Sequence, residues 1–353
     1  MQFSNKASAQ IRNERYGQVL TYSPKVFLPV TNLCRNHCSY CTFRRSPGQA
    51  GAHTMTPDEV VETLSAGARM GCVEALLCLG DTPESGFPSY QRQLESWGFR
   101  STVDYLDWIA RRAEELGLLA HTNAGILDAE SMTRLRQSNV SLGLMLESNA
   151  NRLCGRGMPH FSAPDKAPKV RRQMIAEAGA QRIPFTSGIL VGFGETYEER
   201  VEAVDVLAQL HSSFGHLQEV IIQPFRPHEG TRMADAPAAV DATLLETIAM
   251  ARLRLPSEVS LQAPPNLAPG MIEALIKAGV NDFGGISPLT PDFINPSYPW
   301  PHIDALAARC QSLGFTLQPR LPVYSRYVEE SGWIDPRLLG SVHRIEDRLR
   351  EAA

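Results

Sequence analysis

The chain has 353 residues, of which 43% are apolar, and a formal net charge of −4 at pH 7. This apolar fraction is enough for a sizeable core, whereas the charge and the absence of a basic run argue against nucleic-acid binding. The sequence has no apolar stretch of about 18 residues that would span a membrane, and its start carries no secretory signal. Seven cysteines, an odd number, fit a reducing compartment better than a disulfide framework, so the protein is expected to be cytoplasmic. From its charge and hydropathy we expect no nucleic-acid or membrane partner.

Apolar runs and amphipathic segments alternate along most of the chain. Residues 1–24 are predicted as a polar extension with some helix, and Val26–Thr31 as a short strand broken by Pro29. Further strands are expected near 73–79, 118–122, 140–146, 183–191, 217–224, 259–262 and 281–285. Helices are expected near 56–71, 103–116, 129–137, 166–178, 197–210, 242–253 and 269–277, the first with Thr56 as its cap.

This alternation predicts the fold class. About eight strand–helix units indicate an α/β protein with a (β/α)8 TIM-type barrel, whose reactive groups gather at the C-terminal ends of the strands. We expect one domain over residues 1–353, with a core from about 25 to 300. Two helices near 302–313 and 341–350 are expected to complete or cap the barrel.

Three cysteines follow the first predicted strand. Cys34, Cys38 and Cys41 have the spacing C-x3-C-x2-C, and thiolates bind soft metals and iron–sulfur clusters. In a cluster of four irons, three cysteines leave one iron open to a substrate or cofactor. A structural zinc site is the alternative, but it usually needs a second cysteine pair or several histidines, and the loop holds only His37. The spacing therefore favours a cluster over zinc or over three unrelated buried cysteines.

The cysteine motif resembles that of the radical S-adenosylmethionine (SAM) superfamily, and Tyr40 before the last cysteine also fits. The resemblance implies a 4Fe-4S cluster held by these three cysteines, with SAM on the open iron. Gly80, Asp81 and Thr82 follow the second strand, where the superfamily has a Gly-Gly-Glu-like stretch that binds the amino group of SAM. The match is approximate, and a simple Gly–Asp turn is the alternative.

Two further segments match the superfamily. Glu147 follows the fourth strand, where the resemblance implies contact with the ribose or amino group of SAM; pairing with Arg152 is the alternative. The fifth strand resembles the pattern G-x-I-x-G-x-x-E, in which glycines let the backbone approach adenine. The resemblance thus implies SAM contacts from Ser187, Gly188, Leu190 and Gly192.

Residues 278–296, AGVNDFGGISPLTPDFINP, together with Pro299–Pro301, resemble the CofG family. CofG proteins are the subunit of FO synthase that makes 7,8-didemethyl-8-hydroxy-5-deazariboflavin (FO), the chromophore of coenzyme F-420. The resemblance covers nearly the whole chain. It implies a lyase that releases ammonia from a 5-amino-5-(4-hydroxybenzyl)-6-(D-ribitylimino)-dihydrouracil adduct. It also implies CofH, which supplies the adduct, as functional partner, and an electron donor such as flavodoxin or ferredoxin.

The proton-transfer residues stay open, with candidates at the strand ends: Asp81, Glu147, His228, Asp282 and Asp292. Three alternatives to the CofG reaction stay open at this point. Sulfur insertion of the biotin synthase type needs a second cluster, for which only Cys78 lies near the mouth. A non-enzymatic iron–sulfur carrier would not need the glycine-rich fifth strand. A CofH-like or menaquinone-route enzyme can be separated only by substrate tests.

Overall fold

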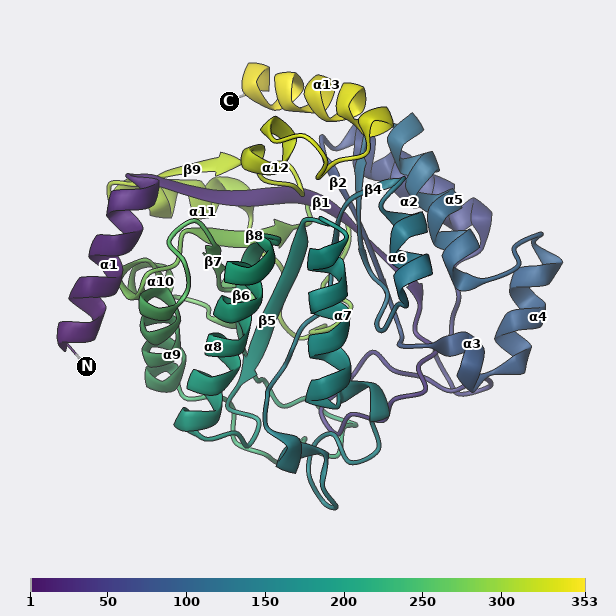
Figure 1. Cartoon of the computed structure of the whole chain (residues 1–353), viewed down its shortest axis with the longest axis horizontal. Coiled ribbons are helices and arrows are strands. Elements are labelled where there is room, and N and C mark those ends of the chain that lie inside the picture. The colour runs from purple at the N-terminus through teal and green to yellow at the C-terminus, as the bar shows by residue number, and fades with distance from the viewer. Residues whose placement is uncertain (1, 353) are drawn as a thin grey trace.

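The computed structural model describes residues 2–352, which form a closed ring of parallel strands surrounded by helices (Figure 1). The first strand, β1 (Val19–Thr31), is 13 residues long and starts well before the predicted Val26. Helix α1 (Gln2–Tyr16) precedes it. The expectation that Pro29 breaks the strand is wrong. The register with the next strand shifts between Pro29 and Thr31, and proline is tolerated at such an irregularity.

The ring contains the eight predicted strands in sequence order, and β1 closes it by pairing with both β2 and β8. This confirms the (β/α)8 barrel. A ninth strand, β9 (Thr316–Pro319), was not predicted and extends the sheet beside the start of β1. The other strands are β2 (Glu74–Leu79), β3 (Leu119–Asn123), β4 (Asn139–Gly143), β5 (Phe185–Val191), β6 (Leu217–Pro224), β7 (Ser260–Gln262) and β8 (Asp282–Ile286).

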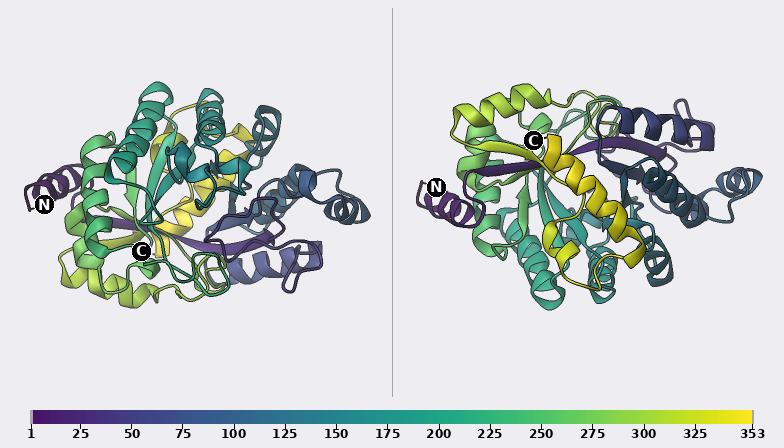
Figure 2. Two further views of the ribbon diagram at one scale, coloured as in Figure 1. Left: turned by 90° about the horizontal axis from the view of Figure 1, so that it is seen from below. Right: turned by 90° about the horizontal axis from the view of Figure 1, so that it is seen from above.

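Two of the helices between the strands begin with a capping box. Thr56 accepts a hydrogen bond from the backbone of Glu59, whose carboxylate binds the Thr56 backbone in return, and Thr196 repeats this capping box before α8. Short helices α3 (Pro83–Gly86) and α4 (Pro88–Ser96) project to the side (Figures 1 and 2). The outer helices are α2 (Pro57–Arg69), α5 (Thr102–Glu115), α6 (Ala129–Leu135), α7 (Pro168–Ala180), α8 (Tyr197–Phe214), α9 (Asp241–Arg254), α10 (Ile272–Ala278) and α11 (Ile303–Ser312). Among the helices of residues 2–352, none combines the length and apolarity needed to cross a bilayer.

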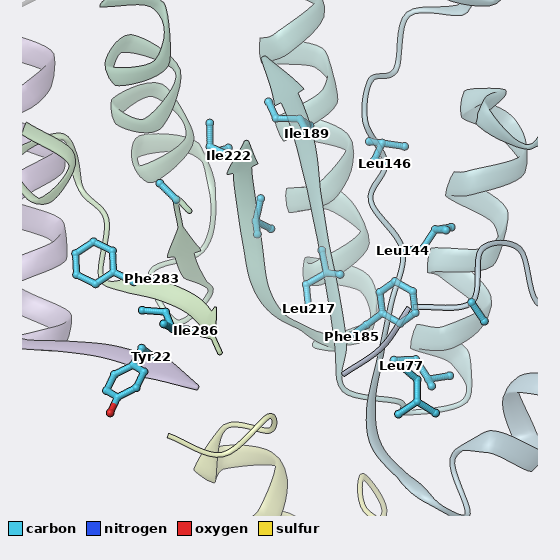
Figure 3. Packing of buried hydrophobic residues seen from close by; sticks show 14 of the residues in the cluster. Tyr22, Leu77, Leu144, Leu146, Phe185, Ile189, Leu217, Ile222, Phe283 and Ile286 are labelled. Carbon is cyan, nitrogen blue, oxygen red and sulfur yellow. The ribbon is translucent and has the colours of Figure 1, made fainter. Parts of the chain in front are cut away.

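The main core holds apolar side chains from strands all around the ring. Figure 3 shows Leu77 of β2, Phe185 of β5, Ile222 of β6 and Ile286 of β8, each fully buried in this cluster. Because both faces of a barrel strand are covered, such strands are continuous apolar runs in the sequence. This is why their positions could be predicted, although β4 ends three residues earlier than expected.

The C-terminal segment covers the end of the barrel where the strands begin. Helices α12 (Ser325–Glu329) and α13 (Pro336–Ala352) follow β9, and α13 lies across the ring (Figure 2, right). Its apolar residues join a second core cluster with Val73, Leu119 and Val140, which lie at the starts of β2, β3 and β4. One end of the barrel is therefore closed, and the opposite end, where the strands finish, holds the cysteine loop.

Candidate active site

The cysteine loop leaves β1 at the open end of the barrel and is held by backbone hydrogen bonds. The His37 N–H donates to the Ser162 carbonyl at 2.8 Å, and the Ser39 N–H to the Pro159 carbonyl at 2.9 Å. The hydroxyl of Thr42 donates to the Ile294 carbonyl at 2.6 Å, which ties this loop to the one after β8. All three cysteines line a cavity of about 350 Å³ at this end.

The donor set of the loop fits an iron–sulfur cluster. All seven cysteines are free. Within residues 2–352, no three histidine, cysteine or acidic side chains converge on a point where they could hold a single metal ion. Cysteines of a cubane bind different irons, so their sulfurs need not converge on one point. Burial raises the pKa of Cys34 to about 11 and that of Cys38 to about 12, so these thiols would lose their protons as metal binds.

Gly80 and Asp81 lie directly against this loop. A side chain at Gly80 would place its Cβ 2.0 Å from the Leu33 carbonyl oxygen, so only glycine allows this close approach. The Asp81 backbone N–H donates to the Cys34 sulfur at 3.1 Å. The Asp81 carboxylate is buried, accepts the Ile126 N–H at 2.9 Å and lies 3.6 Å from Arg171. Burial raises the pKa of Asp81 despite that arginine.

Glu147 enters the cavity beside Lys166, a residue that sequence reasoning missed. The Lys166 Nζ atom donates to the Glu147 carboxylate at 2.5 Å. Burial raises the pKa of Glu147, but the charges of Lys166 and Arg171 outweigh it and the pKa is lowered. The alternative pairing with Arg152 is wrong, because Arg152 binds Glu199 at 2.6 Å. Lys166 ends the short 3₁₀ helix Pro164–Lys166, and nothing local in the sequence marks it.

Thr82 has a supporting position at the rim. Its hydroxyl donates to Asp165 at 3.2 Å, and Arg35 of the cysteine loop donates to the same carboxylate, at 2.7 Å from Nε. Asp165 therefore fastens the segment that carries Lys166 to the cysteine loop. Thr82 itself is not among the described residues that line the cavity.

Tyr40 joins an aromatic group at the cavity wall. Its hydroxyl is 2.9 Å from Nε2 of His160, and its ring packs edge-on to Phe193 and Phe225 with centroid distances of 5.7 and 6.5 Å. Burial lowers the pKa of His160 to about 3, so this ring is neutral near pH 7. His160 was also missed, since it is distant from the motif in sequence.

Gly188 in β5 and Gly192 just after it both pack against other parts of the protein. A Cβ at Gly188 would lie 2.3 Å from the Ile221 carbonyl oxygen, and a Cβ at Gly192 would lie 2.6 Å from the Cβ of Ala239. Gly192 also has φ +86°. Ser187 is fully buried, and of the four fifth-strand candidates only Leu190 lies among the described residues lining the cavity.

The loop after β8 closes the far side of the cavity. Asp292 accepts the N–H groups of Ile294 and Asn295, both at 3.0 Å, and the Asn266 amide at 2.9 Å. Its carboxylate therefore shapes the loop. His228 also lines the cavity, with Nε2 3.4 Å from the Asn295 amide oxygen.

The prediction that Asp282 lies among the strand-end candidates at the mouth is wrong. It is the first residue of β8, at the closed end, where Arg320 binds it at 2.6 Å and Glu219 at 2.7 Å. The Tyr324 hydroxyl also donates to Asp282, at 3.0 Å. This buried network lies on the side away from the cysteines. Polar residues that line the cavity but were missed include Lys25, Asn123, Lys166, Arg171 and Gln223.

The barrel with a three-cysteine loop at its open end defines a radical SAM enzyme, and residues 28–207 match the radical SAM superfamily. Two solved structures share the fold. They are methylornithine synthase PylB (TM-score 0.68, 18% identity, 90% of this chain and 88% of that one) and the hydrogenase maturase HydG from Carboxydothermus hydrogenoformans (TM-score 0.72, 18% identity, 99% and 82%).

Two relatives are much closer in sequence. The 7,8-didemethyl-8-hydroxy-5-deazariboflavin synthase of Methanopyrus kandleri is 43% identical over 330 residues, 93% of this chain and 98% of that protein. The FO synthase of Mycobacterium tuberculosis is 44% identical over 336 residues, which cover 93% of this chain but only 39% of that protein. The chain belongs to the 7,8-didemethyl-8-hydroxy-5-deazariboflavin synthase family, the CofG family of radical SAM enzymes, which uses a 4Fe-4S cluster and SAM.

Proposed function

We propose that this protein converts the 5-amino-5-(4-hydroxybenzyl)-6-(D-ribitylimino)-dihydrouracil adduct to FO with release of ammonia, as an ammonia-lyase type of enzyme. The observation that carries the proposal is the cavity of about 350 Å³ that the three cysteines share with the loop after β8. Its size lies within the usual range for small-molecule sites. The sequence relationship covers nearly all of a deazariboflavin synthase.

Cys34, Cys38 and Cys41 would hold the cluster, which together with SAM would supply one-electron chemistry and a radical able to remove hydrogen from the substrate. The chain's own residues bind and orient SAM and the substrate, and they exclude water from the site. Glu147 and Lys166 offer one carboxylate and one ammonium at 2.5 Å. SAM carries an ammonium and a carboxylate on one carbon, so this pair suits its amino-acid end. Tyr40 and Leu190 supply apolar surface nearby.

The proposed reaction needs two partners, a supplier of the adduct and an electron donor. We propose CofH, which supplies the adduct, as the functional partner of this protein. The electron must come from a carrier such as flavodoxin or ferredoxin. All seven cysteines are free, which favours work in the reducing cytoplasm.

The test is an anaerobic assay with reconstituted protein, SAM, a reductant and the purified CofH adduct. We expect the fluorescence of FO together with 5'-deoxyadenosine and ammonia. The matched control is the protein with all three loop cysteines changed to alanine. Productive SAM cleavage with a different substrate, and no FO from the adduct, would remove the CofG assignment and leave the radical SAM chemistry intact.

A further inference from the structure

Two successive glycines in β8 make room for side chains from both neighbouring strands. A Cβ at Gly284 would lie 1.9 Å from Nε2 of Gln262, and a Cβ at Gly285 would lie 2.3 Å from Cδ of Lys25. Gly284 has φ +68°, a conformation that favours glycine. Gln262 belongs to β7 and Lys25 to β1, on either side of β8. Both side chains therefore lie over the same short piece of backbone, and both line the cavity.

The ammonium of Lys25 has no acceptor among residues 2–352. The residue is 7% exposed, and its Nζ atom lies 4.5 Å from the ring centre of Trp300 and 5.3 Å from that of Phe27. Burial lowers the pKa of Lys25, an effect that the charges of Glu74 and Asp292 oppose. An ammonium has three donors, and leaving them unsatisfied in a buried site costs free energy. The cavity is the place from which an acceptor can come.

The carboxamide of Gln262 is likewise buried without a hydrogen-bond partner among the described residues. It is 7% exposed, and its amide makes no hydrogen bond within the part of the chain that the structure describes. One carboxamide offers a carbonyl acceptor and an NH₂ donor side by side. Together the two side chains present a donor, an acceptor and a donor toward the cavity, next to the aromatic rings of Phe27 and Trp300.

We propose that Lys25 and Gln262 bind the imide edge of a pyrimidinedione ring, the O=C–NH–C=O group of the substrate. Lys25 donates to one ring carbonyl, while Gln262 accepts from the imide N–H and donates to the second carbonyl. Phe27 and Trp300 pack on the flat ring. A phenol offers a single hydroxyl and cannot use all of these groups. The inference rests on the proposed function, because that function supplies the uracil-derived ring.

Binding is measured without turnover, so its outcome is independent of FO formation. The reconstituted protein with SAM is titrated by calorimetry with three probes: ribitylaminouracil, its N3-methyl derivative and p-cresol. Lys25→Met and Gln262→Leu are each expected to weaken ribitylaminouracil binding roughly 10- to 100-fold. The N3-methyl probe should bind the wild type weakly and show no further loss with Gln262→Leu. Lys277→Met is the matched control, because Lys277 is exposed and pairs with Glu273.

A purely structural lysine would give a different result. Removing a buried ammonium that has no acceptor should leave the melting temperature of Lys25→Met equal to the wild type or higher. The proposal is overturned if the wild type does not bind ribitylaminouracil, if both variants bind it normally, or if only p-cresol binding is lost. If Lys25→Met does not fold, the Gln262→Leu and N3-methyl comparison decides. One further outcome separates the two proposals. If the wild type makes no FO, but both variants bind ribitylaminouracil more weakly than the wild type does, the proposed function is refuted and this inference is supported.

Discussion

The Nζ atom of Lys166 lies 2.5 Å from Oε1 of Glu147, inside the cavity that the three cysteines enter. Both residues lie in the connection between β4 and α7, Glu147 near its start and Lys166 near its end. Glu147 is further held to β5, since its N–H donates to the Gly188 carbonyl at 3.1 Å and its own carbonyl accepts the Leu190 N–H at 3.0 Å. Because the ion pair is buried and the backbone of Glu147 is fixed, we expect its disruption to lower both stability and SAM affinity.

Lys166→Ala should therefore leave Glu147 buried without its cation. Breaking a buried pair costs about 3–5 kcal/mol of unfolding free energy, and SAM affinity should fall as well. Because the folded pKa of Glu147 is lowered from 4.5, its contribution to stability is present above pH 4.5 and is lost as the pH falls through the folded pKa. The variant should lack this acid-dependent loss. Denaturant unfolding at pH 7 and at pH 4 measures this change in unfolding free energy, with the exposed Lys169→Ala as control. Equal pH dependence of stability in the wild type and in Lys166→Ala would contradict the prediction.

The cluster should depend on three cysteines only. Changing Cys34, Cys38 and Cys41 to alanine should abolish iron retention after reconstitution while the barrel still folds. Replacing the other four, Cys72, Cys78, Cys154 and Cys310, should leave the iron content unchanged. Iron analysis and circular dichroism provide the two readouts. Loss of iron on replacing Cys78, which also lines the cavity, would show that it takes part in metal binding.

Gly192→Val should act mainly on stability. A Cβ there would lie 2.6 Å from that of Ala239, and the backbone has φ +86°, so the variant combines strain with a clash and should lose several kcal/mol. Gly194 has φ +123° but its nearest neighbour would be 3.9 Å away. Gly194→Val is thus the control for strain alone. Thermal melting and SAM binding should be measured together: a normal melting temperature for Gly192→Val with weak SAM binding would restore a direct role in the adenine site.

Asp292→Ala should abolish FO formation and leave SAM binding intact. Its carboxylate accepts two backbone N–H groups at 3.0 Å in the loop that closes the cavity, so the loop should lose its shape without it. Asp292→Asn keeps one oxygen for those N–H groups and should recover much of the activity. The rate of FO fluorescence and equilibrium dialysis with SAM are the measurements. Equal loss in both variants would indicate that Asp292 moves a proton.

The sequence by itself determined what depends on neighbouring residues in the chain. Apolar runs showed where the strands lie, because a barrel strand is buried on both faces. Thr56 and Glu59 marked the start of α2, since a capping box closes within one turn. The three cysteines could be recognised because their spacing is local, and the loop that carries them leaves β1 where it was expected.

Tertiary structure decided what depends on strand register and on contacts between distant segments. Asp282 lies at the closed end because β8 begins there and Arg320, far along the chain, binds it. Lys25 enters the cavity only because Gly285 of another strand leaves space for its side chain. Lys166 meets Glu147 through the fold of a loop, which no periodic pattern encodes. The cluster ligands could thus be found from the sequence, whereas the polar groups facing the substrate required the assembled barrel.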